Sequence, residues 1–278
     1  ALVQALAAAL AGADTDAVVS AMDETNPDIF KTNWTNAAYT QAVRDAISQL
    51  NVHTYGTSGR LQVGDFARAA DKPLWMSEIE GSWDNGWNPT SIENGIGIAG
   101  RINDDLRELQ PKAWVLWQPV EDLYNMQPSG ENLNWGSVFI DLDCKPYDEG
   151  GVEVWKSKRR VDAAGGVSTG APACGVEVNS KYNTIRNYTH FIRPGDSLIA
   201  VDNTSTTAAV SADGRTTTLV YTNSGTTAAD VTLDLSKFGA IAPGASVTPY
   251  VTTQASSAAN PTGNALVQGA AVPVNATT

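Results

Sequence analysis

The sequence is short of basic residues. Its 278 residues include 18 Lys and Arg against 30 Asp and Glu, so the formal net charge is −12. A chain with this balance repels phosphate backbones and anionic membrane surfaces, and it offers no basic stripe for counterion release. The composition therefore argues against nucleic acid and against membrane surfaces as partners.

Long apolar runs are also missing, because no stretch reaches the length of a membrane span. The first 13 residues, ALVQALAAALAGA, have the length and small-residue ending of a signal-peptide core but no basic leader. Leu2, Leu6 and Leu10 recur every four residues. This spacing predicts an alanine-rich amphipathic helix.

Several catalytic motifs are absent. With only two histidines, His53 and His190, and two cysteines, the chain has no convincing zinc site or Ser-His-Asp set. No Gly-x-Ser-x-Gly elbow supports an α/β hydrolase or esterase, and no Gly-rich phosphate loop follows a strand. One acidic loop lacks EF-hand spacing and is interpreted as a solvated loop; its residues are Asp141, Asp143, Asp148 and Glu149. We expect neither a metal ion nor a cofactor.

What is present favours a folded, exported protein. Hydrophobic residues make up 42% of the chain and include 8 Trp and 8 Tyr, enough for a sizeable core. Charged residues make up only 17%, and the abundance of Thr, Ser, Ala, Asn and Gly is common in secreted proteins. Cys144 and Cys174 either form one disulfide in an oxidising compartment or remain buried free thiols. We expect a secreted, extracellular location.

Up to about residue 193, short apolar runs alternate with helical patterns, which is typical of βα units and a parallel sheet. The predicted strands, read as buried on both faces, are Ala17–Met22, Asn51–Tyr55, Leu74–Ser77 and Ala113–Trp117. Helices are predicted over 36–50, from a capping box at Thr90 and Glu93 to Pro111, and over 180–193.

After Gly195 the helical stripes end and β-rich segments lie between Asn, Gly and Asp turns. The predicted strands are Ser197–Val201, Thr216–Thr222, Asp230–Leu235 and Ser246–Thr253. Their spacing predicts a β-sandwich. We therefore expect an α/β domain at 1–195 and an all-β domain at 196–278. Residues 119–179 form a long excursion that holds both cysteines.

Glu78 ends the apolar run KPLWMSEIEG, and a carboxylate at the tip of a buried parallel strand is where α/β enzymes place their chemistry. Aromatic faces stack on sugar rings while amides and carboxylates bond the hydroxyls. Residues of these kinds stand at other strand ends and on the next loop: His53, Tyr55, Trp83, Trp87, Trp117 and Gln118. The alternative is that Glu78 is an ordinary strand-end residue and the tryptophans are core.

The chain resembles the retaining glycoside hydrolases of family 30 over roughly Ala17 to Asp202. The matching strings are Trp-Met-Ser-Glu at 75–78, His-Thr-Tyr at 53–55, Trp-Gln at 117–118 and KYNTIRNYTHFIRPG at 181–195. The resemblance implies a (β/α)8 barrel, of which strands five to eight are present, followed by a β-sandwich. It also implies that Glu78 is the nucleophile, that Tyr55 hydrogen-bonds it, and that Trp117 floors the sugar site.

The resemblance further implies a catalytic acid/base, which in the family is a Glu at the end of strand four. No residue of this chain matches it, so we expect it on a first half of the barrel that is missing here. In-chain carboxylates that could substitute have ordinary interpretations as hydrogen-bonding groups; they are Asp23, Glu24, Glu80 and Glu121.

The expected activity is retaining, endo-acting hydrolysis of a β-linked polysaccharide. The Glu-Ile-Glu-Gly string after Ser77 and the Trp-Gln-Pro-Val string from Trp117 most resemble the endo-β-1,6-galactanase branch. Xylanases and glucuronoxylanases of the same family are the next alternative. A non-catalytic carbohydrate-binding fragment is a further one, because the acid/base carboxylate is absent. The partner is then an oligosaccharide or polysaccharide.

Overall fold

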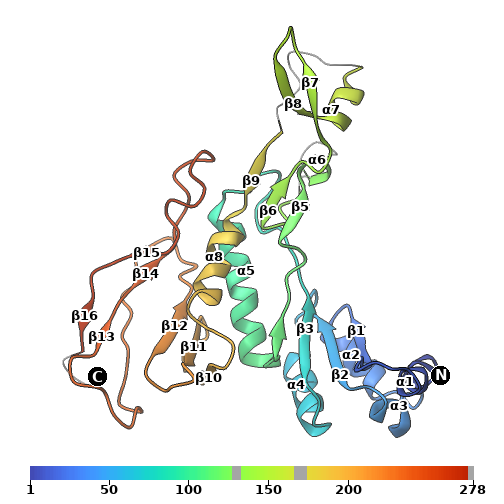
Figure 1. Cartoon of the computed structure of the whole chain (residues 1–278). Helices are drawn as coiled ribbons and strands as arrows, with labels where there is room; N and C mark the ends of the chain where they lie inside the picture. The colour runs from blue at the N-terminus through green and yellow to red at the C-terminus, as the bar shows by residue number, and fades with distance from the viewer. Residues whose placement is uncertain (127–132, 166–173, 275–278) are drawn as a thin grey trace. The chain divides into compact units, whose positions relative to one another are not determined.

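The computed structural model describes residues 1–126, 133–165 and 174–274 (Figure 1). The chain forms two compact units, each assembled from separate stretches of sequence. The first comprises Ala1–Gly81, Gly100–Pro119 and Ala200–Thr207; the second comprises Ser82–Ala99, Val120–Ile199 and Ala208–Thr278. The predicted boundary between residues 195 and 196 stays a prediction.

The first unit is built on a four-stranded parallel sheet in the order β1-β2-β3-β4. Its strands are β1 (Ser20–Glu24), β2 (Gln49–His53), β3 (Leu74–Glu78) and β4 (Ala113–Trp114). Consecutive parallel neighbours require crossover connections, and helices supply them. The predicted βα pattern is thus present, in a mixed α/β fold.

One face of this sheet packs on the helices of the first unit. Those helices are α1 (Leu2–Ala11), α2 (Pro27–Trp34), α3 (Gln41–Asp45) and α4 (Arg60–Ala69). Leu50, Val52 and Met76 are buried on this face, whereas Trp75 on the other face is 39% exposed. The prediction that the strands are buried on both faces is therefore wrong for the described chain, in which β2 and β3 alternate like strands with one covered face.

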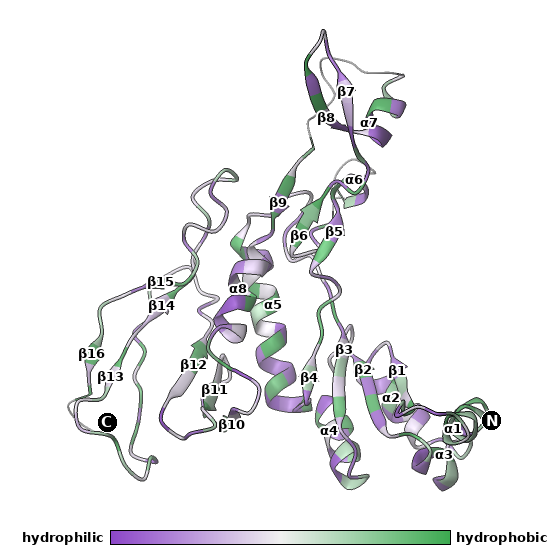
Figure 2. Cartoon of the chain, viewed as in Figure 1, coloured by the Kyte–Doolittle hydropathy of each residue, from purple (hydrophilic) through white to green (hydrophobic). Residues whose placement is uncertain are grey.

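Helix α1 is confirmed, but it packs lightly. Figure 2 colours it almost entirely hydrophobic, yet none of its residues is buried. Only Val3, Ala7 and Leu10 pack against the core of the first unit.

The predicted helix over 36–50 is wrong. Only the five residues of α3 are helical, and β2 begins at Gln49. Ile47 and Leu50 are fully buried, but the backbone N–H of Leu50 donates to the carbonyl of Pro73 at 2.9 Å. Apolar residues at this spacing suit a turn and a buried strand as well as a helix, and pairing with neighbouring strands decides between them.

Helix α5 (Ile92–Asp104) continues directly into the π-helix η1 (Asp105–Leu109). It begins one residue later than the capping box predicted, because Ser91 rather than Thr90 accepts the N–H of Glu93 at 3.3 Å. Gln110 ends η1 in the left-handed conformation, with φ of 55°, one residue before Pro111.

The second unit contains α8 (Ser180–Thr189), which packs on the first turns of α5. The hydroxyl of Tyr188 donates to the carbonyl of Ala99 at 2.9 Å. The excursion between the two helices has structure of its own: β5 (Val120–Asp122), α6 (Leu123–Met126), β6 (Val138–Ile140), β7 (Cys144–Asp148), β8 (Glu153–Ser157), α7 (Lys158–Ala163) and β9 (Val176–Val178). Cys144 and Cys174 are disulfide-bonded, so the free-thiol alternative is wrong.

The C-terminal part is all β, as predicted. Strands β10 (Ser197–Ile199), β11 (Thr206–Val210) and β12 (Thr217–Tyr221) form one sheet in that order. Two short antiparallel pairs follow: β13 (Ser246–Val247) with β16 (Val272–Pro273), and β14 (Tyr250–Val251) with β15 (Val267–Gln268). The predicted strand Asp230–Leu235 is wrong, since that segment has no regular structure. Residues 275–278 of the predicted domain lie outside the described residues.

Candidate active site

The candidate site is formed where β2 and β3 end. Glu78 is the last residue of β3 and His53 is the last residue of β2, and the strand register pairs the two directly. Tyr55 follows His53 by two residues. Because parallel strands end at the same edge of a sheet, residues that are 23 or more positions apart in sequence become neighbours here.

Tyr55 holds the Glu78 carboxylate. Its hydroxyl donates to Glu78 Oε1 at 2.8 Å. Burial, the hydrogen bond to Glu78 and the negative charges of Glu78 and Glu80 all raise the pKa of the Tyr55 phenol above its ordinary value of 10.0. The phenol therefore stays protonated and available as a donor at neutral and mildly alkaline pH.

His53 lies between two carboxylates. Its Nδ1 is 3.6 Å from Glu78 Oε1 and its Nε2 is 3.3 Å from Asp23 Oδ1. The ring also packs edge-on against Tyr55, with ring centroids 5.8 Å apart. Glu78 is thus approached by a phenol and an imidazole from the neighbouring strand end.

Asp23 is the residue of this site whose contacts the sequence did not reveal. It lies in the irregular end of β1 with a φ of 61°, a left-handed conformation that is uncommon for a residue with a side chain. Its Oδ1 also accepts the hydroxyl hydrogen of Ser77 at 2.6 Å. From the sequence, Asp23 was considered only as a possible substitute for the catalytic acid. Its position directly after the predicted strand Ala17–Met22 was the signal that placed it at the same edge of the sheet.

Trp117 and Gln118 follow β4. The backbone N–H of Trp117 donates to the carbonyl of Ile79 at 2.9 Å, which continues the strand pairing past Glu78. Trp117 is 48% exposed, and Gln118 is half-buried. The structure thus brings Trp117 to the residue that follows Glu78.

Trp83 lies in the second unit. Its ring packs on Gly97 of α5, where an added Cβ would come within 2.1 Å of the indole Cγ. The ammonium of Lys181 lies 5.8 Å from the ring centroid. These contacts give Trp83 a packing role within its own unit, and its predicted sugar-binding role stays a prediction.

In the part of the chain that the structure describes, no group of three or more His, Cys, Asp or Glu side chains has the arrangement of a metal site. Two members of the acidic loop face cations instead: Asp143 lies 3.7 Å from Arg159, and Glu149 pairs with Lys156. The helices of the same described residues are all too short or too polar to cross a membrane.

The Glu78 carboxylate thus ends a parallel strand and accepts a hydrogen bond from a tyrosine, and the backbone of an exposed tryptophan, Trp117, pairs with the residue that follows it. Over 262 residues, or 91% of this chain, the sequence is 42% identical to an exo-beta-1,6-galactobiohydrolase of Bifidobacterium longum subsp. longum. Over 238 residues, or 85% of this chain, it is 22% identical to an endo-beta-1,6-galactanase of Hypocrea rufa. Both relatives are named for action on β-1,6-linked galactose units, in agreement with the resemblance predicted from the sequence.

The chain spans 17% of the length of the first relative and 39% of the second. Among solved structures, a conserved exported protein from Bacteroides fragilis matches 75% of this chain and 46% of its own, at 15% identity and a TM-score of 0.50. A GH30 endoxylanase from Clostridium papyrosolvens C71 matches 98% of this chain and 55% of its own, at 16% identity and a TM-score of 0.49. No protein-family model matches the chain.

Proposed function

We propose that this chain is part of a retaining glycoside hydrolase that cleaves β-1,6-linked galactan, with Glu78 as the nucleophile. The observation that carries the proposal is the 2.8 Å hydrogen bond from Tyr55 to Glu78 at paired strand ends. The 42% identity to a galactobiohydrolase across nearly the whole chain supports the choice of substrate.

In the first step, a carboxylate oxygen of Glu78 attacks the anomeric carbon while the bond to the glycosidic oxygen breaks. The departing oxygen takes a proton from a second carboxyl group. In the second step, water attacks the glycosyl ester and gives a proton to the second group, now a carboxylate, while the bond to Glu78 breaks and Glu78 regains its negative charge. Tyr55 donates to the carboxylate oxygen, so its hydrogen bond strengthens whenever that charge is present.

The second carboxyl group must lie about 5 to 5.5 Å from the nucleophile in a retaining enzyme. We assign it to polypeptide outside these 278 residues, together with the other strands of a (β/α)8 barrel in which β1–β4 are strands five to eight. Asp23 is a poor substitute, because its Oδ1 is engaged by both Ser77 and His53.

The all-β C-terminal part supports a β-sandwich at 196–278, and the disulfide supports secretion, because such bonds persist in oxidising compartments. Trp117, Gln118 and His53 are proposed to contact the sugar, since His53 pairs with Glu78 in the strand register and the segment after β4 that carries Trp117 and Gln118 pairs with Ile79.

Exo-acting cleavage is the alternative to the predicted endo-acting cleavage, because the relative with 42% identity is exo-acting by name. The size distribution of products early in galactan hydrolysis separates the two. Internal cleavage releases a range of oligomers, whereas attack from chain ends releases one short product from the start.

The nucleophile is tested in the full-length protein that contains this chain. Glu78→Gln should lower hydrolysis of β-1,6-galactan and of an aryl β-galactoside by at least about 10³-fold. Glu93→Gln, the same substitution at an exposed residue of α5, is the matched control. An activated 2-fluoro-galactoside, whose fluorine slows release of the glycosyl ester, should add its sugar mass to the peptide that contains Glu78.

Normal turnover by Glu78→Gln, or labelling of another peptide, would overturn the nucleophile assignment. Hydrolysis of xylan but not of galactan would overturn the substrate assignment alone. Sugar binding without turnover in the full-length protein would favour the carbohydrate-binding alternative.

A further inference from the structure

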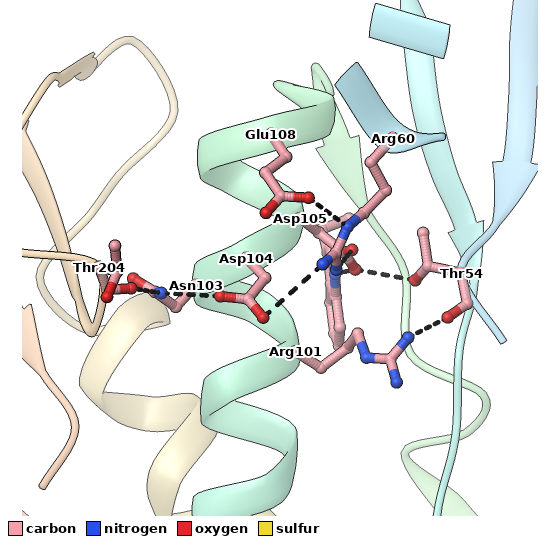
Figure 3. A network of polar contacts seen from close by, with 9 residues as sticks. Thr54, Arg60, Arg101, Asn103, Asp104, Asp105, Glu108 and Thr204 are labelled. Atoms are coloured by element: carbon pink, nitrogen blue, oxygen red, sulfur yellow. Dashed lines mark hydrogen bonds and ion pairs between the residues drawn. The ribbon is translucent and has the colours of Figure 1, made fainter. Parts of the chain in front are cut away.

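A cluster of buried charged side chains joins the end of β2 to η1 (Figure 3). Its centre is Asp105, which is fully buried as the first residue of η1. Asp105 Oδ2 accepts hydrogen bonds from the Thr54 hydroxyl at 2.8 Å and from Trp114 Nε1 at 3.0 Å. Its Oδ1 accepts from Arg60 Nη1 at 3.0 Å. Both oxygens of the carboxylate are therefore engaged.

The two arginines of the cluster have different targets. Arg60 is buried and also donates from Nε to Glu108 at 2.8 Å. Arg101 donates to the backbone carbonyl of Thr54. Figure 3 shows the side chains of Arg60 and Arg101 on either side of Asp105, with Thr54 facing it. Thr54 is thus held twice, once through its hydroxyl and once through its backbone.

Asp105 is the first residue of the π-helix η1. The N–H of Gln110 donates to the carbonyl of Asp105 at 3.0 Å, an i→i+5 bond that widens the turn. Asp105 and Leu109, the first and last residues of η1, are buried, and Leu106 is half-buried. Such π turns are often found at functional sites.

Stability alone does not account for a buried carboxylate here. Burial raises the pKa of Asp105, while hydrogen bonds from Trp114, Arg60 and Thr54 act in the opposite direction. Buried ion pairs can often be replaced by well-packed apolar side chains without loss of stability. A polar centre, however, can hold Thr54 in one orientation through directed bonds, which apolar contacts cannot do.

Thr54 matters because of its neighbours. It stands between His53 and Tyr55, the two residues that approach Glu78. Thr54 is fully buried and points into the cluster, whereas Tyr55 is 38% exposed and reaches Glu78 from the other side of the backbone. Holding Thr54 in place therefore also holds the backbone of Tyr55, from which the Tyr55 side chain extends toward Glu78.

We infer that Asp105 is a positioning residue for the nucleophile: by holding Thr54 it keeps the Tyr55 hydroxyl within hydrogen-bond reach of Glu78. This inference rests on the proposed function of Glu78. Misplacement of a catalytic group by about 1 Å can lower a rate by about 100-fold. Loss of the Thr54 anchor, a smaller perturbation, should lower kcat by about 10-fold on the same scale.

The test is a double-mutant cycle in the full-length protein. Thr54→Val removes the hydroxyl and keeps the shape, and it is made in both the wild type and Tyr55→Phe. kcat for an activated aryl β-galactoside and Tm are measured for all four proteins. We expect Thr54→Val to lower kcat about 10-fold in the wild type and less than about twofold in Tyr55→Phe, because it acts through Tyr55. Its effect on Tm should be the same in both backgrounds.

The matched control is Thr207→Val. Thr207 is 3% exposed in the same unit, and its hydroxyl donates to Asn103 Oδ1 at 2.9 Å. This variant should lower Tm similarly and leave kcat unchanged. Thr54→Ser keeps the hydroxyl and should restore kcat, which keeps the inference testable if Thr54→Val folds poorly.

The outcomes separate the inference from the proposed function. If Tyr55→Phe lowers kcat but Thr54→Val lowers it equally in both backgrounds, the positioning role of Asp105 is refuted and the nucleophile assignment stands. If Thr54→Ser behaves like Thr54→Val, the positioning role is also refuted. If Tyr55→Phe leaves every rate unchanged, the role of Tyr55 in the proposed mechanism fails.

Discussion

Replacing Tyr55 by Phe should slow the second chemical step more than the first. In the proposed mechanism, the Glu78 carboxylate loses its charge as the glycosyl ester forms and regains it as water releases the sugar. The hydrogen bond from Tyr55 therefore stabilises the departing carboxylate of the second step. Without it, the glycosyl ester is expected to accumulate.

The size of the effect follows from the bond. A hydrogen bond to a charged group contributes about 1.5–3 kcal/mol. The oxygens are 2.8 Å apart, and the Glu78 side chain is 29% exposed, so solvent weakens the bond and the lower part of the range applies. At 1.36 kcal/mol per factor of ten, a loss of about 1.5–2 kcal/mol slows release of the ester about 10- to 30-fold.

The assay is pre-steady-state release of an aryl group from an activated β-galactoside by the full-length protein. Tyr55→Phe should show a burst of one aryl group per active site followed by a slow steady rate, with wild-type burst rate to within a few-fold. Because Tyr55 is 38% exposed, loss of its hydroxyl in Tyr55→Phe should change Tm little. A variant with no burst and an unchanged steady rate would refute the reasoning about Tyr55.

Two further predictions concern stability. Burial raises the pKa of Asp105 above its ordinary 3.8. The folded protein therefore binds a proton at Asp105 more tightly than the unfolded chain does. As the pH falls through the folded pKa, the wild type should gain stability relative to Asp105→Asn. Tm of both proteins between neutral pH and 3.8 checks this; a difference that moves against the wild type on acidification would contradict it. On helix α5, Gly97→Ala would place a Cβ 2.1 Å from Trp83 Cγ and should cost about 1–3 kcal/mol. Gly100→Ala meets nothing within 4 Å and should stabilise by up to about 1 kcal/mol. Denaturant midpoints of the two variants give the comparison, and equal shifts would refute the packing account.

Much of the candidate site could be predicted because it depends on strand ends. Once 51–55 and 74–77 are interpreted as neighbouring parallel strands, His53, Tyr55 and Glu78 must converge. The predicted strand Ala17–Met22 put Asp23 at the same edge of the sheet, but its contacts with His53 and Ser77 could not be predicted, because they depend on a left-handed backbone and on the irregular end of β1.

The cluster around Asp105 was missed for a related reason. Asp105 lies on the same helix face as the buried residues Ile98, Ile102 and Leu109, but a hydrophobic pattern counts only apolar residues as core. A carboxylate in that inward position is therefore invisible to periodicity, although the structure buries it. The failed helix over 36–50 reflects the same limit of periodicity, since Ile47 and Leu50 are buried in a turn and a strand rather than on one helix face.

The disulfide between Cys144 and Cys174 has a consequence for the continuity of the chain. It joins two positions 30 residues apart, so the polypeptide between them forms a covalent ring. A protease that cuts one peptide bond within that ring opens it without parting the protein. The piece that carries Glu78 and the piece that carries the C-terminal strands would stay joined until a reductant separates them.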